Sequence, residues 1–180
     1  AKTPKLAGTP AATGWLNDRA ATLRPYHRSL KAWNDGFLPG GRAAADPSIE
    51  AAYWTGREAD ERPPEELLRA GRRLTTYNDE YLYYVLGQPN DFRYPTGRRI
   101  YDDWTPRVVR GTRAVSRTYD DQILGGTFAV WGDVPDAQTQ DQVAAGIFMP
   151  LRAVAQKLWD PGQPPLSWSE FTALARRLGN

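Results

Sequence analysis

Short apolar runs alternate with helical patterns along most of the chain. Strand-forming runs occupy residues 29–36, 48–56, 72–79 and 123–130. Apolar positions with helical spacing, or helix start and stop signals, mark residues 15–23, 63–71, 139–159 and 168–178. Short strands that alternate with helices are typical of parallel βα units. The pattern therefore predicts an α/β fold built on a parallel sheet.

Two segments interrupt this alternation. Residues 80–86 fit either a continued strand or one helical turn, and the pattern does not choose between them. Residues 88–121 form a long connection rich in proline, glycine and charge, with a short helix expected at 101–104. A connection of this length is uncommon unless it is functional.

Capping signals are clear at two of the helices. Thr13 is a candidate cap for the first helix. Ser167 precedes the last helix and Glu170 stands three residues later, which is the spacing of a capping box.

The length of 180 residues limits what these elements can form. A complete (β/α)8 barrel needs about 250 residues. Four strands within a βα alternation therefore predict half of such a barrel. We expect residues 1–160 to form that half, and residues 161–180 to form a linker and a terminal helix that packs on it.

Composition and missing motifs exclude several classes of site. The chain has no cysteine, which excludes disulfides and thiolate chemistry, and its net charge of +2 is dispersed, which gives no case for nucleic acid. No apolar run approaches the roughly 18 residues of a membrane helix. His27 is the only histidine and sits between a helix and a strand, so a Ser-His-Asp triad is disfavoured. No nucleotide-binding glycine motif occurs, so no cofactor is expected. The pairs Asp102-Asp103 and Asp120-Asp121 are better explained as solvated carboxylates in loops than as metal ligands, so no metal is expected.

Aromatic residues and carboxylates gather at the ends of the predicted strands. The chain holds 7 Trp and 9 Tyr, and the residues at the strand ends are Trp33, Asp35, Trp54, Tyr77, Asp79, Trp131 and Asp133. The carboxyl ends of barrel strands form the mouth of the active site. Indole rings stack on the apolar faces of sugars while carboxylates accept hydrogen bonds from hydroxyls. The pattern predicts a carbohydrate-binding pocket, with packing in the core as the alternative for any single member.

The same strand ends resemble a known family. Residues 31–36 (KAWNDG), 52–54 (AYW), 77–79 (YND) and 125–133 (GGTFAVWGD) resemble the second half of the catalytic barrel of glycoside hydrolase family 20, which contains β-N-acetylhexosaminidases and lacto-N-biosidases. Residues 78–87 most resemble its bacterial surface or secreted branch, and the whole resemblance covers about residues 15–160. It implies the C-terminal half of a TIM barrel, about strands 5 to 8.

The resemblance also implies a reaction and a role for each strand-end residue. The reaction is removal of a terminal β-linked N-acetylhexosamine, or a related disaccharide, with the substrate's own acetamide oxygen as nucleophile. Tyr77 would be the catalytic residue that donates a hydrogen bond to that oxygen. The substrate-binding residues would be Trp33, Trp54 and Trp131 as walls, Asp79 and Asp133 as acceptors, and Asp35 near the mouth. The family more often has Glu at the position of Asp133.

One part of the family's machinery is missing from this sequence. The general acid is a Glu in a Gly-Gly-Asp-Glu segment, which does not occur here, and Asp60-Glu61 is a near match only in residue type. We therefore expect the acid upstream of Ala1 and no hydrolysis by this chain alone. The alternative is a non-catalytic carbohydrate-binding or structural half-barrel. Expected partners are an N-acetylhexosamine-containing glycan and either the N-terminal half of the barrel or a second copy bound at the open edges. The resemblance places the protein outside the cell or on its surface.

Overall fold

The computed structural model describes residues 9–37, 44–55 and 62–179. Its main sheet has four parallel strands in the order β1 (Lys31–Trp33), β2 (Glu50–Tyr53), β3 (Leu74–Thr76) and β5 (Ile123–Gly126). A second parallel pair joins β4 (Tyr83–Val85) to β6 (Ala129–Trp131). The predicted α/β class with parallel strands is confirmed.

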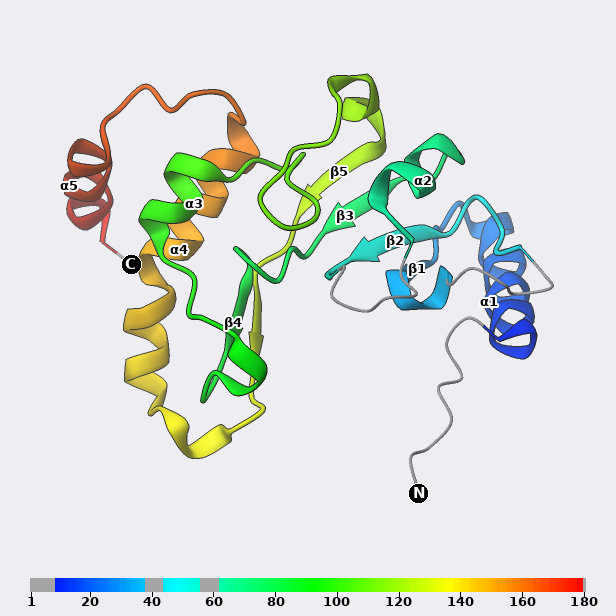
Figure 1. The fold of residues 1–180 in the computed structure, drawn as a ribbon, viewed down its shortest axis with the longest axis horizontal. Coiled ribbons are helices and arrows are strands. Elements are labelled where there is room, and N and C mark those ends of the chain that lie inside the picture. The colour runs from blue at the N-terminus through cyan, green and yellow to red at the C-terminus, as the bar shows by residue number, and fades with distance from the viewer. Residues whose placement is uncertain (1–8, 38–43, 56–61, 180) are drawn as a thin grey trace.

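Helices lie at both ends of the molecule (Figure 1). The α-helices are α1 (Pro10–Leu23), α2 (Pro64–Arg69), α3 (Gly97–Asp103), α4 (Gln140–Trp159) and α5 (Trp168–Leu178). Short 3-10 turns occupy Arg24–Tyr26, Asn34–Phe37, Pro89–Asp91, Arg117–Gln122 and Pro135–Ala137. The first two α-helices accompany β1 to β3, whereas α3, α4 and α5 gather beside β4 (Figure 1). No helix in the described ranges is both long and apolar enough to cross a bilayer.

The strand expected at residues 123–130 is two strands. β5 pairs with β3, and its Gly125 has a φ of +126°, a conformation that side chains disfavour. The register shifts at this point, between Leu74 and Thr75 on the partner strand. After the break, Ala129 N–H donates to the Leu82 carbonyl at 2.8 Å, and β6 continues beside β4. Residues 80–86 are therefore a turn followed by a separate strand, which settles the alternative that the sequence left open.

The capping signals at the C-terminal end of the chain are confirmed. The side chains of Ser167 and Glu170 form the expected capping box of α5. The first helix differs from its prediction, because the cap is Thr9, whose hydroxyl accepts from Ala12 N–H at 3.2 Å. Pro10 occupies the first helical position, where its missing N–H costs nothing. Thr13 is instead buried inside the helix.

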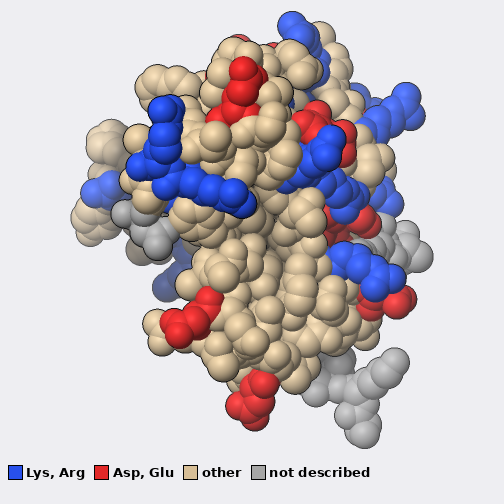
Figure 2. Space-filling model, turned by 90° about the vertical axis from the view of Figure 1, so that its left-hand side faces the viewer, with Lys and Arg blue, Asp and Glu red and all other residues tan. Residues whose placement is uncertain are grey.

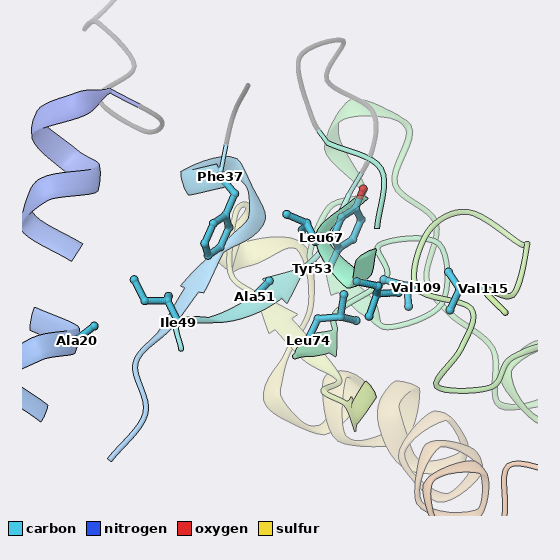
Figure 3. Close-up of a cluster of buried hydrophobic side chains, with 10 residues drawn as sticks. Ala20, Phe37, Ile49, Ala51, Tyr53, Leu67, Leu74, Val109 and Val115 are labelled. Carbon is cyan, nitrogen blue, oxygen red and sulfur yellow. The ribbon is translucent and has the colours of Figure 1, made fainter. Parts of the chain in front are cut away.

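The core is divided into two clusters. In one, alternate residues of the strands point at α1 and α2, and Figure 3 shows Ile49, Ala51, Tyr53, Leu67 and Leu74 in this cluster. The other surrounds the buried Trp104 and joins α3, α4 and α5. Tyr101 stacks on Phe171 with ring centroids 4.5 Å apart, which fixes the terminal helix to α3.

The opposite face of the main sheet is open. Lys31, Thr75 and Leu124 from three strands line a hollow of about 630 Å³ together with Leu158 from α4. Leu124 is 44% exposed, and Lys31 donates to the Thr75 hydroxyl at 2.9 Å. The face away from α1 and α2 therefore carries apolar surface that the described residues do not cover.

Candidate functional site

A cavity of about 420 Å³ opens at the carboxyl ends of the strands. It is lined by Trp33, Asp35, Trp54, Tyr83, Val85, Asn90, Phe92, Trp131 and Asp133. Five of these nine were predicted from the sequence as site residues. The structure therefore brings together side chains from β1, β4 and β6 and from the residues just after β1, β2 and β6.

Asn34 holds the ends of β1 and β2 in place. Its side-chain oxygen accepts from Trp54 N–H at 2.9 Å, and its side-chain nitrogen donates to the Thr55 carbonyl at 3.1 Å. The amide thus continues the pairing of the strands beyond their last backbone hydrogen bond. Asn34 is buried, so water cannot replace either bond cheaply. This clamp sets the separation of Trp33 and Trp54 on the cavity wall.

Replacement of Asn34 tests this clamp. Asn34→Ala is expected to lower the free energy of unfolding by about 2 kcal/mol, because two buried backbone groups lose their partners. Denaturant unfolding measures the change. Asn17→Ala is a matched control on α1, where the amide also makes two hydrogen bonds to backbone groups but is only partly buried. A loss no larger than that of the control would contradict the clamp.

The aromatic rings form a connected wall. Trp54 stacks on Tyr83 with centroids 5.8 Å apart and planes 6° apart. Trp131 contacts both Tyr83, at 5.5 Å, and Trp33, at 6.3 Å. Trp33 and Trp131 are 39% and 37% exposed, so part of each ring faces the opening. Large indole faces left partly exposed in a cavity are suited to stacking on a flat ligand.

The two other predicted residues lie differently. Tyr77 meets the Trp33 ring edge-on at 4.7 Å, so it adjoins the wall although it is not one of the nine lining residues. Asp79 is buried behind the wall, where its Oδ2 accepts from the Thr55 hydroxyl at 3.1 Å. Its N–H donates to the Trp54 carbonyl at 2.9 Å. These contacts make Asp79 a neighbour of the site, and its predicted contact with sugar stays a prediction.

The polar groups of the cavity include hydrogen-bond acceptors and a hydrogen-bond donor. The Oδ1 atom of Asp35 is buried and has no hydrogen-bond partner within the described part of the chain. Burial, followed by the charge of Asp79, raises the pKa of Tyr83 well above its usual range. The Tyr83 hydroxyl therefore stays protonated and can donate. Together with the exposed carboxylate of Asp133, this set matches the donors and acceptors of a hydroxyl-rich ligand.

The aromatic residues in and beside the long connection, Tyr81, Tyr83, Tyr84, Tyr94, Tyr101 and Trp104, fit either a lining of the cavity or packing on the barrel, and of these only Tyr83 lines the cavity. Asn90 and Phe92 come from the start of the long connection, where no periodic pattern pointed to them. Tyr83 was one of several tyrosines in a run, and its neighbours Tyr81 and Tyr84 are buried elsewhere. Successive residues of a strand point to opposite faces, which explains why Tyr83 lines the cavity and Tyr84 does not. That signal could be used only once residues 83–85 were known to form a strand.

Metal-binding groups were not found among residues 9–37, 44–55 and 62–179, where no three His, Cys, Asp or Glu side chains converge. Asp102 pairs with Arg98 at 3.2 Å, and Asp120 with Arg107 at 3.7 Å. The near match Asp60-Glu61 lies outside the described residues.

One curated relative and several solved structures are similar to this chain. No family model matches it. A lacto-N-biosidase from Bifidobacterium bifidum is 25% identical over 169 residues, which is 94% of this chain and 15% of that protein. The crystal structure of dispersin B superposes with a TM-score of 0.66 and 23% identity, covering 81% of this chain and 47% of the other.

Two further solved structures agree with this result. The GH20 catalytic modules of the pneumococcal exo-β-D-N-acetylglucosaminidase StrH give a TM-score of 0.61 at 23% identity, with 81% of this chain and 36% of theirs covered. A β-N-acetylhexosaminidase from Bacteroides fragilis gives 0.63 at 18% identity, with 92% and 33% covered. The chain thus spans less than half of each of these relatives. Together with the strand-end motifs, these similarities support a relationship to glycoside hydrolase family 20.

Proposed function

We propose that this chain is the sugar-binding half of the catalytic barrel of a glycoside hydrolase that removes terminal β-linked N-acetylhexosamine or a related disaccharide. The observation that carries the proposal is the cavity at the strand ends, where Trp33, Trp54 and Trp131 meet Asp35 and Asp133. Aromatic walls with a few convergent acceptors are the expected chemistry for a sugar. The names of the similar proteins point to hexosamine as the sugar class.

The open face of the main sheet supports the proposal that this chain is half of a barrel. β1 and β5 are edge strands, and an uncovered parallel sheet face is unusual because such sheets are normally buried on both sides. α4 also carries apolar residues at its surface, among them Leu151 at 42% exposure. Figure 2 shows a large uncharged area on the side of the molecule that carries α3 to α5. We propose that the other half of a (β/α)8 barrel covers these surfaces and that this chain supplies about strands 5 to 8.

The proposed reaction begins with the substrate itself. The acetamide oxygen attacks the anomeric carbon, a carbon–oxygen bond forms to give a cyclic oxazolinium-like intermediate, and the glycosidic carbon–oxygen bond breaks. The leaving oxygen takes a proton from a general acid. Water then attacks the anomeric carbon, the carbon–oxygen bond to the acetamide breaks, and the general acid, now deprotonated, takes the proton of the water, so that configuration is retained. Tyr77 would hold the acetamide oxygen, the tryptophans would enclose the acetamide and the sugar face, and Asp133 would accept from ring hydroxyls.

The general acid is proposed to come from the other half of the barrel. No carboxylate pair preceded by glycines occurs in this sequence. The 180-residue chain is therefore expected to bind the sugar without hydrolysing its glycosides.

Calorimetric titration and a hydrolysis assay together test the proposal. The 180-residue chain is expected to bind N-acetylglucosamine, to bind glucose at least about tenfold more weakly, and to leave a chromogenic N-acetyl-β-glucosaminide intact. Trp54→Ala is expected to abolish detectable binding. Tyr26→Ala removes an aromatic ring that is 72% exposed outside the cavity and is expected to change nothing. Equal affinity for glucose would contradict the acetamide pocket, and hydrolysis by the chain alone would contradict the assignment of the acid to the other half.

A further inference from the structure

We propose that this chain carries a second site, a pocket that binds the phosphate group of a small phosphate monoester. The pocket lies where β1, β2 and β3 begin and has a volume of about 510 Å³, which is in the range of small-molecule sites. The sugar cavity opens at the other end of these strands, so the proposal stands apart from the proposed function. The polar lining of the pocket consists of Arg24, His27, Arg28, Ser29, Ser48 and Arg73.

Three separate segments bring this lining together. Residues 24–30 lead from α1 into β1, residues 47 and 48 precede β2, and residues 71 and 73 precede β3. The three strands are parallel neighbours, so the residues before each of them meet at one end of the sheet. They supply three guanidiniums, whose planar forks match the oxygens of a phosphate. Two serine hydroxyls and one imidazole add further hydrogen-bond donors.

One of the three arginines has a free guanidinium. Arg24 pairs with Asp46 at 2.7 Å, and Arg73 pairs with Glu50 at 2.6 Å. These carboxylates orient two guanidiniums and leave other N–H groups of each for a ligand. The side chain of Arg28 makes no hydrogen bond or ion pair within residues 9–37, 44–55 and 62–179. Because Arg28 is exposed, it can bind an anion without giving up a contact of the fold.

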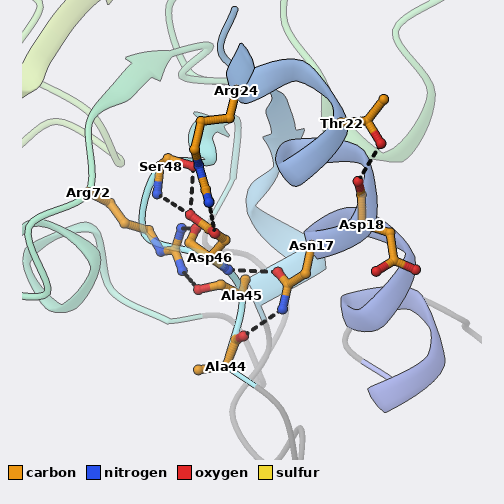
Figure 4. Close-up of polar contacts among 9 residues, drawn as sticks. All are labelled: Asn17, Asp18, Thr22, Arg24, Ala44, Ala45, Asp46, Ser48 and Arg72. Carbon is orange, nitrogen blue, oxygen red and sulfur yellow. Dashed lines mark hydrogen bonds and ion pairs between the residues drawn. The ribbon is translucent and has the colours of Figure 1, made fainter. Parts of the chain in front are cut away.

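A fourth guanidinium lies behind the pocket. Arg72 is buried, and Figure 4 shows it directed at the Asp46 segment from the side opposite the helix that carries Arg24. Its hydrogen bonds go to backbone carbonyls, which carry no net charge to cancel its own. Four guanidiniums against the carboxylates of Asp46 and Glu50 leave an excess of two positive charges. A phosphate monoester carries about −1.5 to −2 at neutral pH and balances this excess, whereas a carboxylate would balance half of it.

The backbone around the pocket is fixed before a ligand arrives. His27 ends the turn after α1 with a φ of +53°, and its N–H donates to the Arg24 carbonyl at 3.1 Å. The next N–H, that of Arg28, donates to the Leu23 carbonyl at 3.3 Å. Gly71 has a φ of +80°, and a Cβ at this glycine would meet nothing within 4 Å, so the pocket is open on that side. A preformed rim lowers the entropy cost of binding.

Calorimetric titration with three small anions tests the proposal. At pH 8 and low ionic strength, the 180-residue chain is expected to bind ethyl phosphate with a Kd of about 1 mM or tighter. Ethyl sulfate has the same size but one negative charge instead of two, and it is expected to bind at least about threefold more weakly. Inorganic phosphate is expected to bind more weakly than ethyl phosphate, because it leaves the rest of the pocket empty. Equal or tighter binding of inorganic phosphate would overturn the assignment to an ester.

Variants locate the site. Arg28→Gln removes the free guanidinium and is expected to weaken ethyl phosphate binding at least about fivefold. Arg98→Gln removes the same charge from α3, at the other end of the molecule, and is expected to leave this affinity within about twofold (Figure 1). Equal losses in the two variants would show attraction by overall charge and would overturn the pocket. So would absence of saturable ethyl phosphate binding or equal affinity for ethyl sulfate. None of these results bears on sugar binding, which is measured separately at the other end of the strands.

Discussion

Arg72→Met is expected to lower the free energy of unfolding by about 3 kcal/mol, the largest loss of stability that we predict for a single side chain. The guanidinium of Arg72 is buried and donates to three backbone carbonyls, those of Asp46 at 2.8 Å, Ile49 at 3.0 Å and Ala45 at 2.5 Å. It also lies over the Phe37 ring, 4.4 Å from its centroid. Methionine fills similar space, but it leaves three carbonyls without their donor, and that of Ile49 is fully buried.

The network around Arg72 joins distant parts of the chain (Figure 4). Asp46 N–H donates to the Asn17 side chain at 2.7 Å, which fixes the segment before β2 to α1. The carboxylate of Asp46 accepts from Ser48 and pairs with Arg24 at 2.7 Å. Hydrogen bonds from Ser48 hold the pKa of Asp46 below its usual range, with a smaller contribution from Arg24. Arg72 thus holds residues 45–49, just before β2, from the side facing the core.

Arg24→Met is the matched control for this prediction. Arg24 binds the same Asp46, but its side chain is 64% exposed, and an exposed ion pair contributes less than about 1 kcal/mol. Denaturant unfolding of both variants measures the difference. Similar losses for Arg72→Met and Arg24→Met would show that the three carbonyls do not depend on the buried guanidinium.

Local signals in the sequence were sufficient for most of the fold. The capping box of α5 and the Pro and Glu residues at the start of α2 act within one turn, so their helices could be predicted from neighbouring residues. The split between β5 and β6 could not, because it depends on β4. That strand is separated from β6 by the whole of residues 88–121, and pairing between such distant segments leaves no local pattern.

The residues of the candidate site likewise fall into those that local sequence signals predict and those that they do not. Trp33, Trp54 and Trp131 were predictable because each stands at the end of a strand, and the carboxyl ends of parallel strands meet at one edge. Phe92 and Asn90 reach the cavity through a strained turn whose shape depends on Tyr84, Tyr94 and α4. Nothing within a few residues of Asn90 specifies that geometry. Asn34 was visible in its motif, but its role as a clamp required the positions of the Trp54 and Thr55 backbone atoms.

Tyr77→Phe is expected to have the largest effect on the proposed chemistry. The substitution removes one hydroxyl and keeps the ring that meets Trp33 edge-on at 4.7 Å. The backbone bond from Tyr77 N–H to the Tyr53 carbonyl, at 2.6 Å, also persists. The variant therefore distinguishes a role of Tyr77 as donor to the acetamide oxygen from a purely structural role. Loss of one such donor costs about 10² to 10³ in rate, since the bond strengthens as charge moves onto the acetamide.

Binding of a stable thiazoline analogue of the cyclic intermediate measures this donor in the 180-residue chain. Tyr77→Phe should weaken that binding about 100-fold and weaken N-acetylglucosamine binding less than about tenfold, because the donor serves the reacting form more than the ground state. Tyr83→Phe is the control, since it removes a cavity hydroxyl while keeping the ring that stacks on Trp54. We expect it to weaken both affinities to about the same extent, because its hydroxyl meets no developing charge. Equal effects of the two variants on the analogue would contradict the assignment of Tyr77. A hydroxyl that donates to the acetamide must bind the cyclised sugar more tightly than the open sugar, whereas any other hydroxyl of the cavity need not.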